Sequence, residues 1–226
     1  MSRRAVLAAG LALAVLWAAP AAALEFEGEG TGTPRPAYPR AAGVAAAGRF
    51  LAGRAGQTAF AVLDDRGRLS GVRIHERFDS ASVVKAMLLV AYLDRLAATH
   101  RPLDAGGRSL LYPMIHVSDN GAASAVFAIV GQDGLARLAR QVGMTDFQTS
   151  PAWGFTQISA ADQARFFFVQ DRLIPPRFDA YARWLLSGIS PDQSWGVPAV
   201  ARPAFRVFFK GGWFPSLGLV NQVARL

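Results

Sequence analysis

Strand-like segments stand near both ends of this chain and enclose a long middle with helical periodicity. A hairpin is expected over 58–77 with its turn at 64–67, and a second over 206–226 with its connection at 215–218. Helical patterns cover 41–55, 82–97, 120–130, 135–142, 160–173 and 177–186. Because a sheet must bury one face against another layer, we expect an α/β domain of the α+β type. Its antiparallel sheet would combine N- and C-terminal strands and pack against a helical lobe over about 82–200.

The first 40 residues read as an export signal followed by a linker. Arg3 and Arg4 precede an apolar stretch over 5–19 and three small residues at 21–23, the layout of a secretory signal peptide over 1–23. The arginine pair fits a twin-arginine signal as well as a Sec signal. Glu, Gly, Thr and Pro dominate 24–40, which favours a flexible linker. We therefore expect one extracytoplasmic domain over 41–226.

Composition excludes several classes of protein. The chain of 226 residues is 52% hydrophobic and contains no cysteine, so it has ample core material but no disulfide, thiolate zinc site or cysteine nucleophile. His75, His100 and His116 lack metal-ligand spacing, and neither a metal nor an organic cofactor is expected. The net charge of +8 favours weak attraction to an anionic cell envelope. The arginines do not cluster with stacking aromatics, so nucleic acid is not an expected partner.

Lysine occurs at two positions only, Lys85 and Lys210, although Lys and Arg together number 24. Ser82-Val83-Val84-Lys85 opens an apolar helical pattern, and the three-residue offset places the hydroxyl and the amine on one helical face. Burial would lower the lysine pKa, so that the neutral amine could take the serine proton. A structural interpretation stays open, in which Ser82 or Asp79 caps the helix and Lys85 extends to water.

Two further motifs follow in the chain. Ser118-Asp119-Asn120 precedes a helix of small residues and could act simply as its cap. Lys210-Gly211-Gly212-Trp213 places the second lysine in an apolar strand, where the glycines would allow a ligand or another backbone to come close.

In this order, Ser-x-x-Lys, Ser-Asp-Asn and Lys-Gly-Gly resemble the three-part signature of the class A serine β-lactamases and the penicillin-binding DD-peptidases. The resemblance covers residue 58 to the end of the chain. It implies the β-lactamase/transpeptidase fold, with the site in a groove between sheet and helical lobe. It also implies β-lactams or D-Ala-D-Ala-like ends of peptidoglycan stem peptides as substrates. We expect a monomer.

The resemblance also implies roles for the motif residues. Ser82 would be the nucleophile, Lys85 its base, and Ser118 the serine that passes a proton to the leaving nitrogen. The backbone N–H groups of Ser82 and Trp213 would form the oxyanion hole, where each donor contributes about 3 kcal/mol to transition-state stabilisation.

Substrate binding would fall to the residues beside these. Asn120 would orient Lys85 and the substrate amide, and Lys210 would meet the substrate carboxylate. Gly211, Gly212 and Trp213 would line the strand along which the substrate lies.

The sequence departs from the family pattern in three places. Gly211 replaces the usual threonine or serine, which removes a hydroxyl contact to the substrate carboxylate. The glutamates, at 25, 27, 29 and 76, all precede Ser82. The deacylating glutamate of class A enzymes is therefore missing, and Asp146, the one acid in the corresponding short segment, more simply caps a turn. The family's last strand and C-terminal helix are also missing, which would leave open edges in the sheet.

Other features have plainer interpretations. His116 lies two residues before Ser118, but no G-x-S-x-G elbow accompanies it, so a Ser-His-Asp triad is rejected. Trp153, Trp195 and Trp213 could line a cleft, although core packing is the commoner role for the first two. Residues 166–168 are three phenylalanines and fit the buried face of a helix.

The sequence thus predicts an exported serine hydrolase or acyltransferase that forms an acyl-enzyme on Ser82 and releases it slowly. Two alternatives stay open. One is a true β-lactamase with an unusual route of deacylation, and the other is a non-catalytic protein that binds β-lactams or peptidoglycan.

Overall fold

The structure, a computed structural model, describes residues 41–226. The expected signal peptide (1–23) and linker (24–40) lie outside the described residues. The helices are α1 (Ala41–Ala52), α2 (Val84–Ala98), α3 (Ala105–His116), α4 (Asn120–Val142), α5 (Ala160–Leu173), α6 (Pro176–Ser187) and α7 (Val197–Ala201). The strands are β1 (Phe60–Leu63), β2 (Leu69–Val72), β3 (Arg77–Asp79), β4 (Gln157–Ser159), β5 (Phe208–Phe214) and β6 (Leu219–Arg225). Short 3-10 turns are η1 (Ala81–Val83), η2 (Trp153–Phe155), η3 (Pro191–Gln193) and η4 (Pro215–Leu217).

Both expected hairpins form. β1 pairs antiparallel with β2, and the Asp64 side chain closes their turn by accepting the backbone N–H groups of Arg66 at 3.0 Å and Arg68 at 2.8 Å. β5 pairs antiparallel with β6 through η4 and Gly218, whose φ of 62° suits glycine. The prediction of antiparallel strands at both ends of a helical middle is confirmed.

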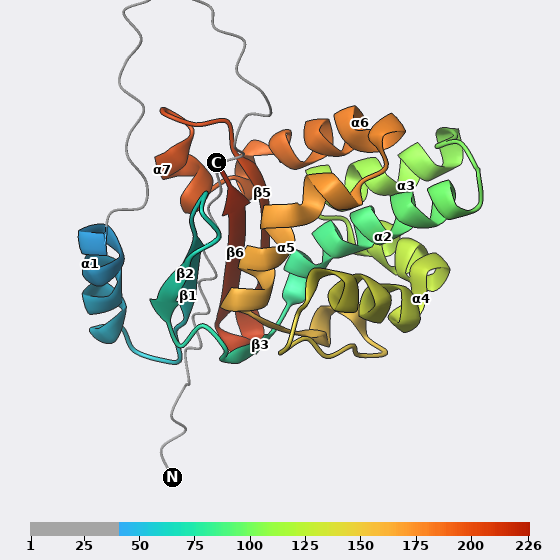
Figure 1. Cartoon of the computed structure of the whole chain (residues 1–226). Coiled ribbons are helices and arrows are strands. Elements are labelled where there is room, and N and C mark those ends of the chain that lie inside the picture. The colour runs from blue at the N-terminus through green and yellow to red at the C-terminus, as the bar shows by residue number, and fades with distance from the viewer. Residues whose placement is uncertain (1–40) are drawn as a thin grey trace, which may run out of the picture.

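The strands of the two ends do not join into one continuous ladder. Within residues 41–226 they form three two-stranded sheets: β1 with β2, β3 with β4, and β5 with β6. α5 packs against both β1 and β6 (Figure 1), so one helix covers both hairpins. β6 is the last element of the described residues. Within 41–226, no strand is hydrogen-bonded to both hairpins.

The short pair β3–β4 was not expected from the sequence, yet it positions the candidate site. It brings the segment just before Ser82 against the end of the loop that follows α4. Ser80 N–H continues this pairing by donating to the Thr156 carbonyl at 2.8 Å. Asn221 on β6 donates from Nδ2 to the Asp79 carbonyl at 2.7 Å. The residues leading into α2 are therefore held from two sides.

α2 is the centre of the helical lobe, in contact with α3, α4, α5 and α6 (Figure 1). Every residue from Val84 to Leu93 is buried. Each large apolar side chain removed from water in this way stabilises the fold by about 1.5–3 kcal/mol. α2 therefore forms a rigid base for the side chains at its N-terminal end.

The other helices agree only in part with those predicted from the sequence. α4 spans both of the expected helices, and Gly131, with φ of 69° and ψ of 172°, kinks it where the sequence predicts a break. α3 was not among the expected helices, and it contains Pro113. Phe166 and Phe167 are buried and Phe168 is partly buried, as predicted. None of the helices within 41–226 is both long enough and apolar enough to cross a membrane.

Candidate active site

Ser82 stands at the N-terminal end of α2, inside the 3-10 turn η1. The residue at the N-cap of α2 is Val83, and neither Ser82 nor Asp79 caps the helix through its side chain. The structural interpretation of this serine is therefore wrong. Ser82 is partly buried and borders β5, because a Cβ built on Gly212 would lie 2.5 Å from its backbone nitrogen. The prediction that a glycine here lets another backbone come close is confirmed for Gly212.

Two non-glycine residues at this site have positive φ angles. Ala81, immediately before Ser82, has φ of 44°, and Ser118 has φ of 60°. Such conformations cost on the order of 1–3 kcal/mol each and persist only where the surrounding structure imposes them. The packing around the site therefore fixes the backbone at both serines.

Lys85 is fully buried, so the interpretation in which its amine extends to water is wrong. Its Nζ donates to the Ser118 carbonyl at 2.5 Å, to Ser118 Oγ at 3.2 Å and to Asn120 Oδ1 at 2.8 Å. These three bonds occupy all three donors of an ammonium group, and none goes to Ser82. A neutral amine has two donors and a lone pair, so loss of one proton would free that lone pair for Ser82.

Lys210 approaches the same serine from β5. It is fully buried, and its Nζ donates to Ser118 Oγ at 3.0 Å and to the Gly211 carbonyl at 2.9 Å. The Ser118 hydroxyl therefore lies between two amines that are distant in sequence. Asp119 stands beside Ser118, but its carboxylate accepts the backbone N–H of Ala122 at 2.6 Å and caps α4.

Burial lowers the pKa values of both lysines, Lys85 and Lys210. Desolvation lowers the pKa of Lys85 to about 8, opposed in part by the negative charge of Asp119. Desolvation, together with the charge of Lys85, lowers the pKa of Lys210 to about 7. Near neutral pH the site therefore resists carrying two protonated amines, and one of them is available to accept a proton.

Trp153 and Ser124 also belong to this group, although the sequence motifs do not include them. The Lys85 Nζ lies 4.9 Å from the centroid of the Trp153 ring, and Trp153 Nε1 donates to Ser124 Oγ at 3.1 Å. Ser124 follows Asn120 by four residues, so helical spacing places both on one side of α4. That spacing is a sequence signal that could have identified Ser124.

More aromatic side chains flank β5. Phe155 stacks on Phe214 with 5.2 Å between ring centroids, and Trp195 packs against Trp213 at 5.6 Å. Phe155 and Trp195 are both exposed, and Trp153 is partly buried. The expectation of core packing is therefore wrong for Trp195, whereas Trp153 packs against the edge of the main hydrophobic core.

Asp146 and His116 are engaged away from Lys85. The Asp146 carboxylate contacts His75 Nδ1 at 2.8 Å and accepts Ser159 Oγ–H at 2.8 Å, and these contacts lower its pKa against the effect of burial. His116 places Nδ1 2.5 Å from the Gly188 carbonyl and stacks on Tyr112. Neither residue joins the group around Ser118. Residues 41–226 also hold no cluster of three or more metal-ligating side chains.

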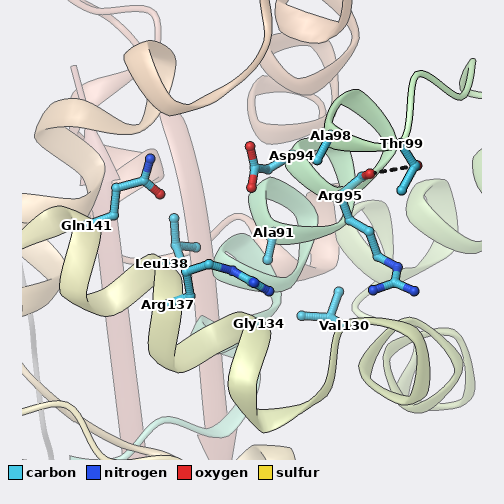
Figure 2. Close-up of a pocket in the computed structure, with 10 residues that line it drawn as sticks. All are labelled: Ala91, Asp94, Arg95, Ala98, Thr99, Val130, Gly134, Arg137, Leu138 and Gln141. Carbon is cyan, nitrogen blue, oxygen red and sulfur yellow. Dashed lines mark hydrogen bonds between the residues drawn. The ribbon is translucent and has the colours of Figure 1, made fainter.

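A separate cavity of about 260 Å³ lies at the opposite end of α2, between that helix and α4. Figure 2 shows its lining residues, which include Ala91, Asp94 and Arg95 of α2 and Gly134 and Arg137 of α4. None of the motif residues takes part in it. The cavity is therefore distinct from the candidate active site.

Comparison with known proteins gives the fold. No protein-family model matches the chain, and no match is found among curated proteins. A β-lactamase from Sphaerobacter thermophilus matches at TM-score 0.61 and 20% identity, over 70% of this chain and 73% of that one. A β-lactamase from Xanthomonas campestris matches at 0.55 and 20%, over 65% and 68%. A variant of the class A β-lactamase of the last common ancestor of Gram-negative bacteria matches at 0.56 and 21%, over 70% and 73%.

At this level of identity the matches establish architecture. The chain has a β-lactamase-like fold, and class A β-lactamases are among its structural neighbours. The resemblance inferred from the three motifs is confirmed at the level of the fold.

Gly212→Ala should destabilise the protein, because the new Cβ would meet the backbone nitrogens of Ser82 and Val83 at 2.5 and 2.7 Å. We expect the free energy of unfolding to fall by about 1–3 kcal/mol, as for other overpacked sites. Gly43→Ala in α1 is the matched control, because no atom lies within 4 Å of its added Cβ. Urea denaturation measures both, and equal stabilities would contradict the close approach of β5 to η1.

Lys210→Met should stabilise the protein at pH 6 by about 1–4 kcal/mol, because it removes a buried cation. The folded-state pKa of about 7 lies below the ordinary value of 10.5, so the cost of the lysine is complete below pH 7. This cost disappears as pH rises towards 10.5, so the stabilisation by Lys210→Met should shrink in parallel. Urea denaturation at pH 6 and pH 10 tests this, with exposed Arg66→Met as control. A gain independent of pH would refute it.

Proposed function

We propose that this protein is an exported serine acyl-transfer enzyme that forms an acyl-enzyme on Ser82. Its substrates would be β-lactams or the D-Ala-D-Ala-like ends of peptidoglycan stem peptides, and release of the acyl group would be slow. The observation that carries the proposal is the hydrogen-bonded group of Lys85, Ser118, Asn120 and Lys210 at the N-terminal end of α2, in which both lysines are fully buried.

Acylation would begin with attack of Ser82 Oγ on the amide carbonyl. Lys85 in its neutral form accepts the hydroxyl proton, and the new bond makes a tetrahedral intermediate. The Ser118 hydroxyl, hydrogen-bonded to Lys85, passes a proton to the leaving nitrogen and takes one from Lys85. The C–N bond then breaks, which leaves an ester on Ser82 and a neutral amine as the leaving group.

Charge on the substrate would be met by residues of β5 and by the backbone at Ser82. The backbone N–H groups of Ser82 and Trp213 would hold the developing oxyanion, and the close approach of Gly212 to Ser82 supports this arrangement. Lys210 would meet the substrate carboxylate, whose negative charge raises the pKa of Lys210 and keeps it protonated. Lys85 would then be the neutral member of the pair.

Slow release is proposed because no carboxylate is placed to activate a water molecule. Within residues 41–226, no carboxylate is hydrogen-bonded to Lys85, Ser118, Asn120 or Lys210. Asp119 caps α4, and Asp146 is held by His75 and Ser159. Export is inferred from the sequence of residues 1–23, and a cell-envelope location suits a peptidoglycan substrate.

Incubation with benzylpenicillin should add one drug mass to the mature protein, because opening of the lactam retains all its atoms on Ser82. Intact mass spectrometry measures the adduct. Ser82→Ala should show none, whereas Ser109→Ala, an exposed serine on α3, should behave as wild type.

Each other result has a definite meaning. Drug hydrolysis without a persistent adduct would replace slow release with a true β-lactamase. Noncovalent, saturable binding that is unchanged in Ser82→Ala would overturn the proposal in favour of a binding protein.

The acylation rate should rise with pH between 6 and 8, because Lys85 acts in its neutral form and its pKa is about 8. The neutral fraction increases by roughly fifty-fold over that range, which sets the expected gain. Time-resolved mass spectrometry measures the rate. Lys85→Ala should remain unacylated at every pH while its thermal unfolding stays near wild type. A pH-independent rate would remove Lys85 from the role of base.

A further inference from the structure

Trp153 covers one side of the Lys85 amine. The face of its indole ring lies over Nζ, with 4.9 Å between Nζ and the ring centroid. The indole N–H points to a different partner and donates to Ser124 Oγ at 3.1 Å. The side chain is half-buried and belongs to η2, in the loop between α4 and β4. An apolar ring therefore lies directly against the amine that the proposed mechanism uses as its base.

The indole is held between two elements of the site. Ser124 belongs to α4, which also supplies Asn120. On the other side, a Cβ built on Gly154 would lie 3.0 Å from the Phe214 ring, and Phe155 stacks on that ring. The neighbours of Trp153 are thus packed against β5.

The loop that carries Trp153 is tied at both ends. The buried Asp162 carboxylate accepts the backbone N–H groups of Thr145 at 3.0 Å and Asp146 at 2.8 Å. At the other end, Thr156 accepts the Ser80 N–H, and β4 pairs with β3. The position of the indole is therefore set by several independent contacts.

Release of an acyl group from Ser82 requires a water molecule at the ester carbonyl and a group that accepts its proton. An indole provides neither, because its one polar atom is a donor and Ser124 occupies that donor. We infer that Trp153 is a positioning residue that keeps water from the Lys85 side of the acyl-enzyme and so lengthens its lifetime. The inference rests on the proposed function and extends it to the choice between retention and hydrolysis.

The lifetime of the adduct tests this. Wild type, Trp153→Ala and Trp153→Phe are acylated with benzylpenicillin, freed of excess drug and followed by intact mass. Trp153→Ala should lose its adduct about tenfold faster or more, because water reaches the ester. Trp153→Phe keeps an aromatic face but loses the bond to Ser124, so its adduct lifetime should fall between those of wild type and Trp153→Ala. Trp184→Ala is the matched control, since Trp184 is exposed on α6 and packs on Tyr112 and Tyr181.

Hydroxylamine provides a readout that a merely structural role would not change. Its nitrogen attacks the ester carbonyl, the bond from that carbon to Ser82 Oγ breaks, and Ser82 regains its proton. The release rate should increase linearly with hydroxylamine concentration, with a steeper slope in Trp153→Ala than in wild type. Thermal unfolding of both proteins is measured alongside, and a similar melting temperature is expected.

The outcomes separate this inference from the proposed function. Equal lifetimes and equal hydroxylamine slopes would overturn the role of Trp153 and leave the acylation of Ser82 intact. Absence of any wild-type adduct would overturn both. A Trp153→Ala protein without adduct supports the inference if it hydrolyses the drug and contradicts it if it does not. Should that variant fail to fold, Ser124→Ala, which removes the acceptor of the indole N–H, must shorten the lifetime.

Discussion

The site depends on two buried amines that share one hydroxyl. Lys85 and Lys210 both donate to Ser118 Oγ, and each lies in surroundings that are otherwise largely apolar. An isolated ammonium in such a place costs several kcal/mol, so the fold must compensate through hydrogen bonds and lowered pKa values. Asn120 and the Ser118 carbonyl do this for Lys85, and the Gly211 carbonyl does it for Lys210. The chemistry available to Ser82 is a consequence of that compensation.

The parts of this arrangement that are local in sequence could be predicted. The three-residue spacing from Ser82 to Lys85 determines their common helical face, and a glycine in an apolar strand indicates a close neighbour, which here is the backbone of η1. The hairpins could be predicted because their turns carry the residues that turns require. The break at Gly131 could be predicted for the same reason.

The contacts between residues that are far apart in the sequence could not be predicted. Nothing in the sequence around Trp153 indicates that its ring lies on Lys85, because that contact depends on how the loop after α4 folds back between α4 and β5. β3 and β4 are three residues each, too short for an alternating pattern, and they pair across about 80 residues. α3 contains Pro113, a residue type that usually interrupts a helix, and continues past it to His116. Long-range packing decided each of these features.

The hydrogen bond from Lys210 to Ser118 joins residues 92 positions apart, and that from Asn221 to Asp79 joins residues 142 apart. Contacts of such high sequence separation form late, because most of the chain must already be ordered before they can close. A nascent chain or a proteolytic fragment that lacks β5 has Ser82 and Lys85 but lacks Lys210. Under the proposed mechanism, Ser82 would therefore gain its full set of partners only when almost the whole domain is in place.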